Sequence, residues 1–255
     1  MPITDRHLTI LTGGSRGMGL AMAEQLLAAG HTLLTLSRRV NDDLAQQAEA
    51  RRADLTQWPA DLADSTAICA HLQEWLARFD AGHFASATLI NNAGVVPPIG
   101  PLRDADGPDL ANALRVGLEA PMLLTAAFLH ATRDWRGARK VLNISSGLGR
   151  RAMASQAGYC AAKAGMDHFT RSLALDEALV PNGAKVCSLA PGTIDTDMQV
   201  QLRGADAAAF PDRGRFERLK SEGQLSSADE AARHVLAYLA RPDFGTEPVA
   251  DVRHA

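Results

Sequence analysis

Residues 12–19 read Thr-Gly-Gly-Ser-Arg-Gly-Met-Gly, and they stand between a short apolar run and a longer run rich in alanine and leucine. This order predicts a β-strand that turns sharply into an α-helix. Glycine lets the backbone approach a ligand closely and adopt positive φ, and the N–H groups at a helix N-terminus attract anions. We therefore expect the loop to bind the pyrophosphate of a dinucleotide. Its spacing departs from the usual fingerprint, so a plain tight turn is the alternative.

The alternation of short apolar runs with longer helical patterns continues along the whole chain. It predicts an α/β fold: a single doubly wound Rossmann-type domain over residues 1–255, with a parallel seven-stranded sheet and helices on both faces. The expected strands are Leu8–Thr12, Thr32–Leu36, Leu55–Trp58, Thr88–Asn91, Val141–Ser145, Lys185–Leu189 and Val249–Val252. The expected helices are Met18–Ala29, Ser65–Phe79, Leu110–Thr132, Gln156–Leu179 and Ala228–Leu239.

The composition excludes several classes of protein. With 46% hydrophobic and 22% charged residues, a chain of 255 residues can bury a large core without disulfides or metals. Cys69, Cys160 and Cys187 form no C-x-x-C pair, and the eight histidines show no ligand spacing, so we expect neither a disulfide framework nor a metal site. A net charge of -3, without a signal peptide or an apolar run of membrane length, predicts a cytoplasmic protein that binds small molecules rather than nucleic acid or membranes.

The end of the second expected strand indicates which dinucleotide is bound. Residues 37–39 read Ser-Arg-Arg, where an NAD site places a carboxylate for the ribose 2′-hydroxyl. Arginine attracts a 2′-phosphate, and Arg16 in the glycine loop can close on the same group. We therefore expect NADP(H). The alternative is that the two arginines only precede a solvated helix, while Asp42 or Asp43 takes the ribose.

A candidate catalytic pair lies in the fourth expected helix. Tyr159, one of two tyrosines in the chain, precedes Lys163 by four residues, which puts both side chains on one helix face. There the ammonium is expected to lower the pKa of the phenol from about 10 toward working pH, as a general acid for ketone reduction requires. Ser145 and Ser146 end the preceding strand, and a hydroxyl there can orient and polarise a substrate carbonyl. For a tyrosine and a lysine alone, a helix surface pair is the alternative.

Together these motifs resemble the short-chain dehydrogenase/reductase family over nearly the whole chain. The shared stretches are residues 12–19, Asp61, residues 91–94 (Asn-Asn-Ala-Gly), Ser146, Tyr159 with Lys163, and residues 191–196 (Pro-Gly-Thr-Ile-Asp-Thr). The resemblance implies that Tyr159 donates the proton, that Lys163 binds the nicotinamide ribose and tunes Tyr159, and that Ser146 holds the carbonyl. The residues expected to contact NADP(H) are Gly13, Ser15, Arg16, Gly17, Met18, Gly19, Ser37, Arg38, Arg39, Asp61, Leu62, Asn92, Ala93, Gly94, Tyr159, Lys163, Pro191, Gly192, Ile194 and Thr196.

Four further stretches, residues 150–152, 167–169, 195–199 and 249–253, look most like the sepiapterin reductase and benzil reductase branch of the family. Enzymes of that branch reduce dicarbonyl or activated carbonyl compounds. The resemblance also favours a homodimer or homotetramer that uses the Leu110–Thr132 helix and the helix after it. Packing of those helices entirely within one monomer is the alternative.

One position departs from the family pattern. Relatives usually carry an asparagine in a context like residues 115–121 (Arg-Val-Gly-Leu-Glu-Ala-Pro), where the matching residue here is Gly117. That asparagine helps to hold a water that relays protons to the lysine. Glycine leaves room for a further water and keeps its carbonyl, so we expect weakened catalysis and a higher turnover number in Gly117→Asn. Asn112 is a competing source of the amide, although its position relative to Pro121 fits poorly.

Residues 195–224 are expected to form a lid over the substrate, because Val200–Gly223 is polar, contains glycine and lacks clear periodicity. A plain surface excursion is the alternative. Asp195 and Asp197 are expected either to bind a polar substrate group or to cap a helix. An apolar pocket is expected to be walled by Val95, Leu148, Met153, Met198 and Phe210.

The sequence thus predicts an enzyme that uses NADPH to reduce a ketone, diketone or pterin-like carbonyl compound to an alcohol. The alternatives are an alcohol dehydrogenase that uses NAD, and an inactive nucleotide-sensing module, to which Gly117 lends weight.

Overall fold

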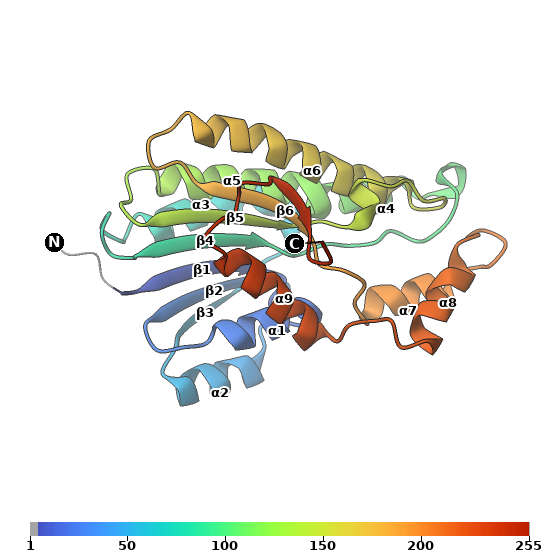
Figure 1. Ribbon diagram of the computed structural model, residues 1–255, viewed down its shortest axis with the longest axis horizontal. Coiled ribbons are helices and arrows are strands. Elements are labelled where there is room, and N and C mark those ends of the chain that lie inside the picture. The colour runs from blue at the N-terminus through green and yellow to red at the C-terminus, as the bar shows by residue number, and fades with distance from the viewer. Residues whose placement is uncertain (1–4, 255) are drawn as a thin grey trace.

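Seven parallel strands form one sheet in the order β3-β2-β1-β4-β5-β6-β7 (Figure 1). The structure is a computed structural model, which describes residues 5–254. Its strands are β1 His7–Thr12, β2 His31–Ser37, β3 Asp54–Pro59, β4 Ser86–Asn91, β5 Ala138–Ile144, β6 Lys185–Ala190 and β7 Val249–Asp251. The predicted fold class is confirmed, and so is each predicted strand, with ends that move by one to three residues.

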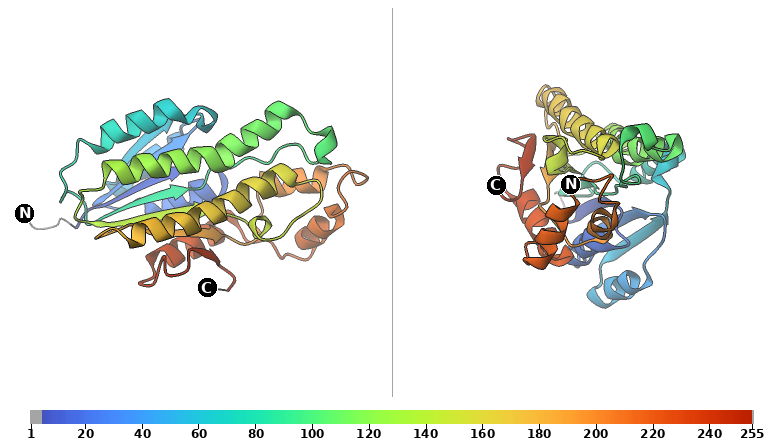
Figure 2. Two further views of the ribbon diagram at one scale, coloured as in Figure 1. Left: turned by 90° about the horizontal axis from the view of Figure 1, so that it is seen from above. Right: turned by 90° about the vertical axis from the view of Figure 1, so that its right-hand side faces the viewer.

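Helices cover both faces of the sheet. They are α1 Gly17–Leu26, α2 Asp42–Arg51, α3 Ser65–Leu76, α4 Gly107–Leu114, α5 Ala120–Ala131, α6 Ala157–Ala178, α7 Asp197–Gly204, α8 Arg213–Ser221 and α9 Ala228–Ala240. Apolar side chains of α1, α2 and α9 pack against one face of the sheet, and those of α3 and α5 against the other. Figure 2 shows α4 and α5 as one long helix beside α6. Among residues 5–254, no helix has the length and apolarity needed to cross a membrane.

The carboxyl ends of the strands meet at one edge of the sheet, where the candidate site residues lie. The strand order reverses at β1, which pairs with β2 on one side and β4 on the other. At such a reversal the loops after the two strands lead to opposite faces and leave a crevice for a ligand. The glycine loop follows β1 at this point, and helices α7 and α8 project beyond the same edge (Figure 1).

Helical structure was underestimated in two places. Helix α2 was not predicted, because it buries only Leu44 and Ala48 and therefore shows a weak apolar stripe. Residues 200–223 were predicted to be irregular, but α7 and α8 occupy most of them. These two helices each bury few side chains, and with Phe210 they form a small separate core, so their periodicity is faint in the sequence.

The predicted Leu110–Thr132 helix is interrupted by a π-helical turn at Arg115–Glu119, which joins α4 to α5. There the N–H of Ala120 donates to the carbonyl of Arg115, five residues back. Pro121 then offers no N–H to the carbonyls of the turn before it. The turn contains Gly117, the position that departs from the family pattern.

Candidate active site

The glycine loop after β1 forms a close-fitting cradle. Gly13 and Gly17 have φ of +72° and +55°, and a Cβ at Gly19 would lie 2.0 Å from the carbonyl oxygen of Gly13. The Thr12 hydroxyl accepts from the backbone N–H of Asn92 at 2.9 Å, and the Asn92 amide donates back to the Thr12 carbonyl. The N-cap side chain of α1 makes no capping hydrogen bond, so the N–H groups of the first helical turn are available to an anion. The cradle therefore fits a pyrophosphate.

At the end of β2, Ser37 is buried, and its hydroxyl has no hydrogen-bond partner within residues 5–254. Arg38 and Arg39 follow it and are exposed. A buried hydroxyl without a partner is costly unless a ligand satisfies it, and two free cations beside it suit a phosphate. Arg16, expected to close on the same phosphate, instead pairs with Asp197 at 2.7 Å, and both side chains of that pair are largely exposed.

Two further expected cofactor residues have structural roles, and of the two only Leu62 is buried. The carboxylate of Asp61 accepts from the backbone N–H of Ala63 at 3.0 Å and so caps the short helical turn that follows β3. The side chain of Leu62 is 6% exposed and belongs to the core under the sheet. The side chain of Leu62 is therefore structural, and only its backbone is left to contact a cofactor.

The segment after β6 returns to the glycine loop. Gly192 has a φ of +85°, which favours glycine, and Ile194 forms a β-bridge with Ser226. The Thr196 methyl would lie 4.0 Å from a Cβ placed at Gly17. The structure therefore brings residues 191–196 and the glycine loop to the same crevice.

The three candidate catalytic residues lie together. Tyr159 and Lys163 are both buried on α6, with the Lys163 Nζ 5.8 Å from the centre of the Tyr159 ring. Ser146, just beyond β5, shares a hydrogen bond with the Tyr159 phenol. The Lys163 Nζ donates to the carbonyl of Ile144 at 2.7 Å, and a Cβ at Gly94 would lie 3.7 Å from it. The Asn-Asn-Ala-Gly loop after β4 therefore adjoins the lysine.

The expected lowering of the Tyr159 pKa is wrong. Burial raises the pKa of Tyr159 to about 12, although the hydrogen bond from Ser146 opposes this rise. Burial also lowers the pKa of Lys163 to about 8, and the charge of Asp167 opposes this fall. Desolvation is the largest cause of both shifts, and the ammonium donates to the carbonyl of Ile144.

Behind the catalytic residues lies a buried carboxylate, Asp167, which is 1% exposed. One of its oxygens accepts from the hydroxyls of Ser145 and Ser188, each at 2.6 Å, and the other accepts from the Arg150 Nε at 3.1 Å. Arg150 also donates to the carbonyl of Ala250 in β7. Asp167 therefore ties α6 to the ends of β5, β6 and β7, and it holds the strand end that carries the catalytic serine.

Replacing Asp167 by asparagine is expected to move the alkaline limb of kcat/KM to lower pH. The carboxylate raises the pKa of Lys163, so its loss lets that pKa fall further, and less ammonium remains at neutral pH. Since kcat/KM reports the free enzyme, its pH profile measures this directly. The loss of the charge that accepts from the partly exposed Arg150 is also expected to cost about 2 kcal/mol of unfolding free energy, measured in urea. Asp251→Asn, which removes a carboxylate paired with Arg253, is the control and should leave the alkaline limb in place.

Gly117 packs against the catalytic helix. A Cβ built on it would lie 3.2 Å from the Cβ of Ala162, which stands between Tyr159 and Lys163. That distance is short for two carbon atoms, so a larger residue requires α5 or α6 to shift slightly.

Ion pairs connect the helices of the expected lid, residues 195–224. The carboxylate of Asp195 contacts the Lys220 ammonium and lies 3.8 Å from the Arg203 guanidinium. The α7 helix has Thr196 at its N-cap and no capping hydrogen bond from that side chain, and Asp197 pairs with Arg16. The expected capping by Asp195 or Asp197 is therefore wrong, because both carboxylates are taken up by basic side chains.

The lid also contacts the body of the domain. The Gln201 amide donates to the carbonyls of Val96 and Pro97, and the Ser155 hydroxyl donates to the carbonyl of Ala209. Phe210 is 0% exposed in the small core that Leu202 and Phe216 complete, so it does not wall an open pocket as predicted. Met153 and Met198 pack against the same core.

Two buried glutamines near the site were missed by sequence reasoning. Gln156 is 3% exposed and Gln199 is 6% exposed. In the part of the chain that the structure describes, the Gln156 Nε2 and the Gln199 Oε1 have no hydrogen-bond partner. Gln156 precedes Tyr159 by three residues and Lys163 by seven, so its position on the catalytic helix face could have been read from spacing alone.

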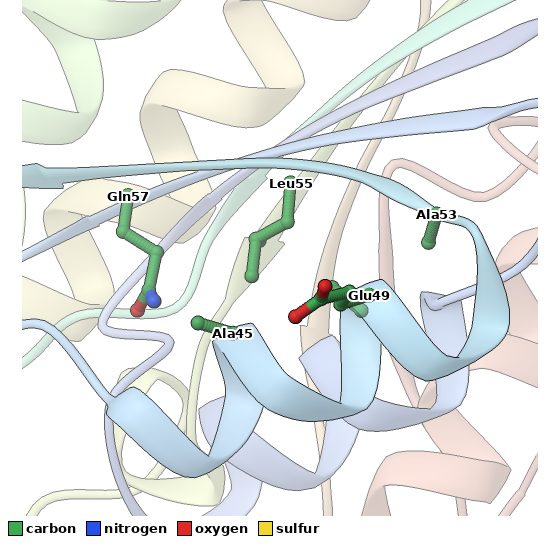
Figure 3. A pocket seen from close by; sticks show the side chains of 6 residues that line it. Ala45, Glu49, Ala53, Leu55 and Gln57 are labelled. Atoms are coloured by element: carbon green, nitrogen blue, oxygen red, sulfur yellow. The ribbon is translucent and has the colours of Figure 1, made fainter.

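A hollow between α2 and β3 is visible in Figure 3. It is lined by Ala45, Ala48, Glu49, Ala53, Leu55 and Gln57, and none of these is an expected site residue. Within residues 5–254, no group of three or more histidine, cysteine or acidic side chains is arranged to hold a metal ion.

Comparison with known proteins places these features in context. Residues 7–207 match the family model described as short chain dehydrogenase. A benzil reductase ((S)-benzoin forming) of Bacillus cereus is 34% identical over 92% of this chain and 94% of that protein. A sepiapterin reductase of Meriones unguiculatus is 33% identical over 92% of each chain. A crystal structure of a short-chain dehydrogenase/reductase from Burkholderia vietnamiensis covers 98% of each chain at 36% identity, with a TM-score of 0.65.

Proposed function

This chain belongs to the short chain dehydrogenase family and is an oxidoreductase, and from that premise we propose that it uses NADPH to reduce a ketone, diketone or pterin-like carbonyl compound to an alcohol. One observation carries the proposal. Ser146, Tyr159 and Lys163 lie together beside a cradle that fits a pyrophosphate. Benzil reductases and sepiapterin reductases among the relatives support a carbonyl substrate.

Ser146, Tyr159 and Lys163 have different roles in the proposed proton transfer. When bound, a reduced nicotinamide supplies the hydride to the carbonyl carbon. Ser146 holds the carbonyl oxygen by a hydrogen bond, and the Tyr159 phenol, which shares a hydrogen bond with Ser146, gives its proton to that oxygen as negative charge develops. The phenolate that remains is stabilised by the buried Lys163 ammonium. The proposed contacts of Lys163 with the ribose and of Ile194 and Thr196 with the nicotinamide amide follow the family pattern.

The preference for NADPH rests on the end of β2. The Ser37 hydroxyl, buried and without a partner, and the two exposed arginines after it suit a 2′-phosphate. The alternative cofactor, NAD, would draw on Asp42 or Asp43, which lie in the first turn of α2. At the N-terminus of that helix, the two carboxylates interact favourably with the helix dipole. This role explains why they are there without a contact to a cofactor ribose.

Three further features belong to the proposal. Residues 195–224 act as the substrate lid, supported by their contacts across the site edge. A homodimer or homotetramer forms through α4, α5 and α6, supported by exposed Leu114, Met122 and Leu123 on the first two helices. The cytoplasm is the proposed location, on the cysteine pattern of the sequence.

Gly117→Asn is expected to raise kcat a few-fold, because the new amide adds a holder for the water that relays protons toward Lys163. Gly117→Ala is the matched control, since it introduces the same contact with Ala162 without an amide. Steady-state turnover of both variants decides the matter. If Asn does no better than Ala, the glycine is not what limits proton relay.

Steady-state assays with benzil test the proposed function. We expect NADPH absorbance to fall as benzoin appears, with a KM for NADPH at least ~10-fold below that for NADH, as expected when about 1.4 kcal/mol separates the two cofactors. A lower KM for NADH would support the alcohol dehydrogenase alternative. Stoichiometric NADPH binding without turnover across a panel of ketones, diketones and pterins would support the nucleotide-sensing module.

A further inference from the structure

We infer that Gln156 binds a second oxygen atom of the substrate, on the carbon next to the one that is reduced, and thereby makes this enzyme selective for 1,2-dicarbonyl compounds. The inference rests on the proposed carbonyl reduction and names the substrate class and the residue that recognises it.

The position of Gln156 on α6 places it with the catalytic residues. Gln156 is the N-cap residue of the helix, and Tyr159 and Lys163 follow it by three and seven residues. Residues spaced by three, four and seven share one face of an α-helix. Gln156 therefore stands about one helical turn before Tyr159 along α6, and the inference places its amide beside the substrate carbonyl.

The Gln156 amide N–H is buried without a hydrogen-bond acceptor from the described part of the chain. The side chain is 3% exposed, and its Nε2 has no hydrogen-bond partner among the described residues. A buried donor left unpaired is costly, so native structures rarely keep one without a reason. A ligand that brings an oxygen to this point removes the cost and gains a hydrogen bond.

The surroundings of Gln156 close the site around such a ligand. The residue before it, Ser155, donates to the lid at Ala209 and has a φ of +61°, and its carbonyl accepts from the N–H of Gly100. On the opposite face of α6, a Cβ at Gly158 would meet Leu110 at 2.5 Å. The start of α6 is thus fixed between the lid and the 97–110 segment, and the Gln156 amide has little freedom to turn to solvent.

The Gln156 amide is a hydrogen-bond donor close to the Tyr159 phenol, and this placement favours one class of substrate. Ser146 and Tyr159 already provide the hydrogen bonds that the reacting oxygen needs. A further N–H donor one helical turn away requires a further acceptor on the same ligand. The second carbonyl oxygen of a 1,2-dicarbonyl compound is such an acceptor, one carbon from the reacting centre, whereas a simple ketone offers only carbon there.

The test compares two substrates that differ at that one oxygen. Benzil carries two adjacent carbonyl groups, and deoxybenzoin has a methylene in place of one of them. We expect Gln156→Met, which keeps the length of the side chain and removes the amide, to lower kcat/KM for benzil ~10- to 100-fold and for deoxybenzoin less than ~3-fold. Gln156→Glu, which replaces the N–H donor with an oxygen, is expected to lower benzil turnover at least as much.

The fold-change in kcat/KM between wild type and Gln156→Met is measured for benzil and for deoxybenzoin, and the two fold-changes are compared. The higher intrinsic reactivity of benzil cancels in each fold-change, so the comparison isolates the contact of Gln156 with the second oxygen. Gln201→Met is the matched control, since it removes a lid glutamine amide that bonds to Val96 and Pro97, and it should affect both substrates equally. Equal losses for both substrates in Gln156→Met, or no loss for either, would overturn the role of Gln156 and leave the proposed function standing. If the wild-type chain reduces neither substrate with NADPH or NADH, the proposed function itself fails and the inference falls with it.

Discussion

Replacement of Tyr159 by phenylalanine is expected to lower kcat for ketone reduction roughly 100- to 10,000-fold, the usual contribution of a positioned proton donor. The phenol is buried and hydrogen-bonded to Ser146, which holds it beside the reacting oxygen, whereas the Lys163 ammonium donates to the carbonyl of Ile144. Phenylalanine keeps the ring and its packing on α6. The binding of NADPH, measured by fluorescence titration, is therefore expected to change little.

The other tyrosine of the chain supplies the control. Tyr238 lies in α9, where its hydroxyl contacts the Cys187 sulfur at 3.8 Å, away from the crevice residues. Tyr238→Phe should keep nearly full activity. If Tyr159→Phe retained wild-type turnover, proton delivery by this residue would be disproved, whatever the fate of NADPH binding.

Removal of both arginines after β2, as Arg38→Ala together with Arg39→Ala, is expected to raise the KM for NADPH ~10- to 100-fold, as the loss of charge-assisted hydrogen bonds worth about 1.5–3 kcal/mol implies. The KM for NADH should change little, because NADH has no 2′-phosphate. The preference between the two cofactors is therefore expected to shrink or reverse. Steady-state kinetics with each cofactor at saturating ketone measures it.

Arg133→Ala is the matched control for charge alone. Arg133 is exposed and pairs with Asp134, in the segment that enters β5 from the other end of the sheet. Its loss should leave both KM values unchanged. An equal rise in the KM for NADPH and NADH in the double variant would instead mean that the arginines only stabilise α2, and that Asp42 or Asp43 serves the ribose.

Strands were the most predictable part of the fold. The central strands are buried on both faces and read as apolar runs, whereas the edge strand β3 is only partly buried and gave a weaker pattern; even the three-residue β7 is visible. The glycine loop was predicted as a sharp strand-to-helix turn despite its unusual spacing, and in the structure a Cβ at Gly19 would collide with the carbonyl of Gly13. Helix α2 and the lid helices escaped prediction because each buries too few side chains to leave a periodic pattern.

At the site, the sequence could name side chains but not their partners. The spacing predicted that Tyr159 and Lys163 share one face of a helix. Their burial, which shifts both pKa values, and the contact of Lys163 with the carbonyl of Ile144 are seen only in the tertiary structure. The same holds for Arg16: its sequence position suits a phosphate, while its observed partner, Asp197, lies 181 residues away. The spacing of Gln156 from Tyr159 and Lys163 is readable in the sequence, but only the structure shows its amide buried and without a hydrogen-bond partner among the described residues.

One measurement addresses the central claim most directly: a single turnover of the wild-type protein with benzil and NADPH deuterated at the transferring position of the nicotinamide, with mass spectrometry of the product. The account predicts benzoin that carries one deuterium on the carbinol carbon and one mole of NADP⁺ per mole of alcohol. Bound NADPH that stays reduced, or benzoin without the label, would contradict it.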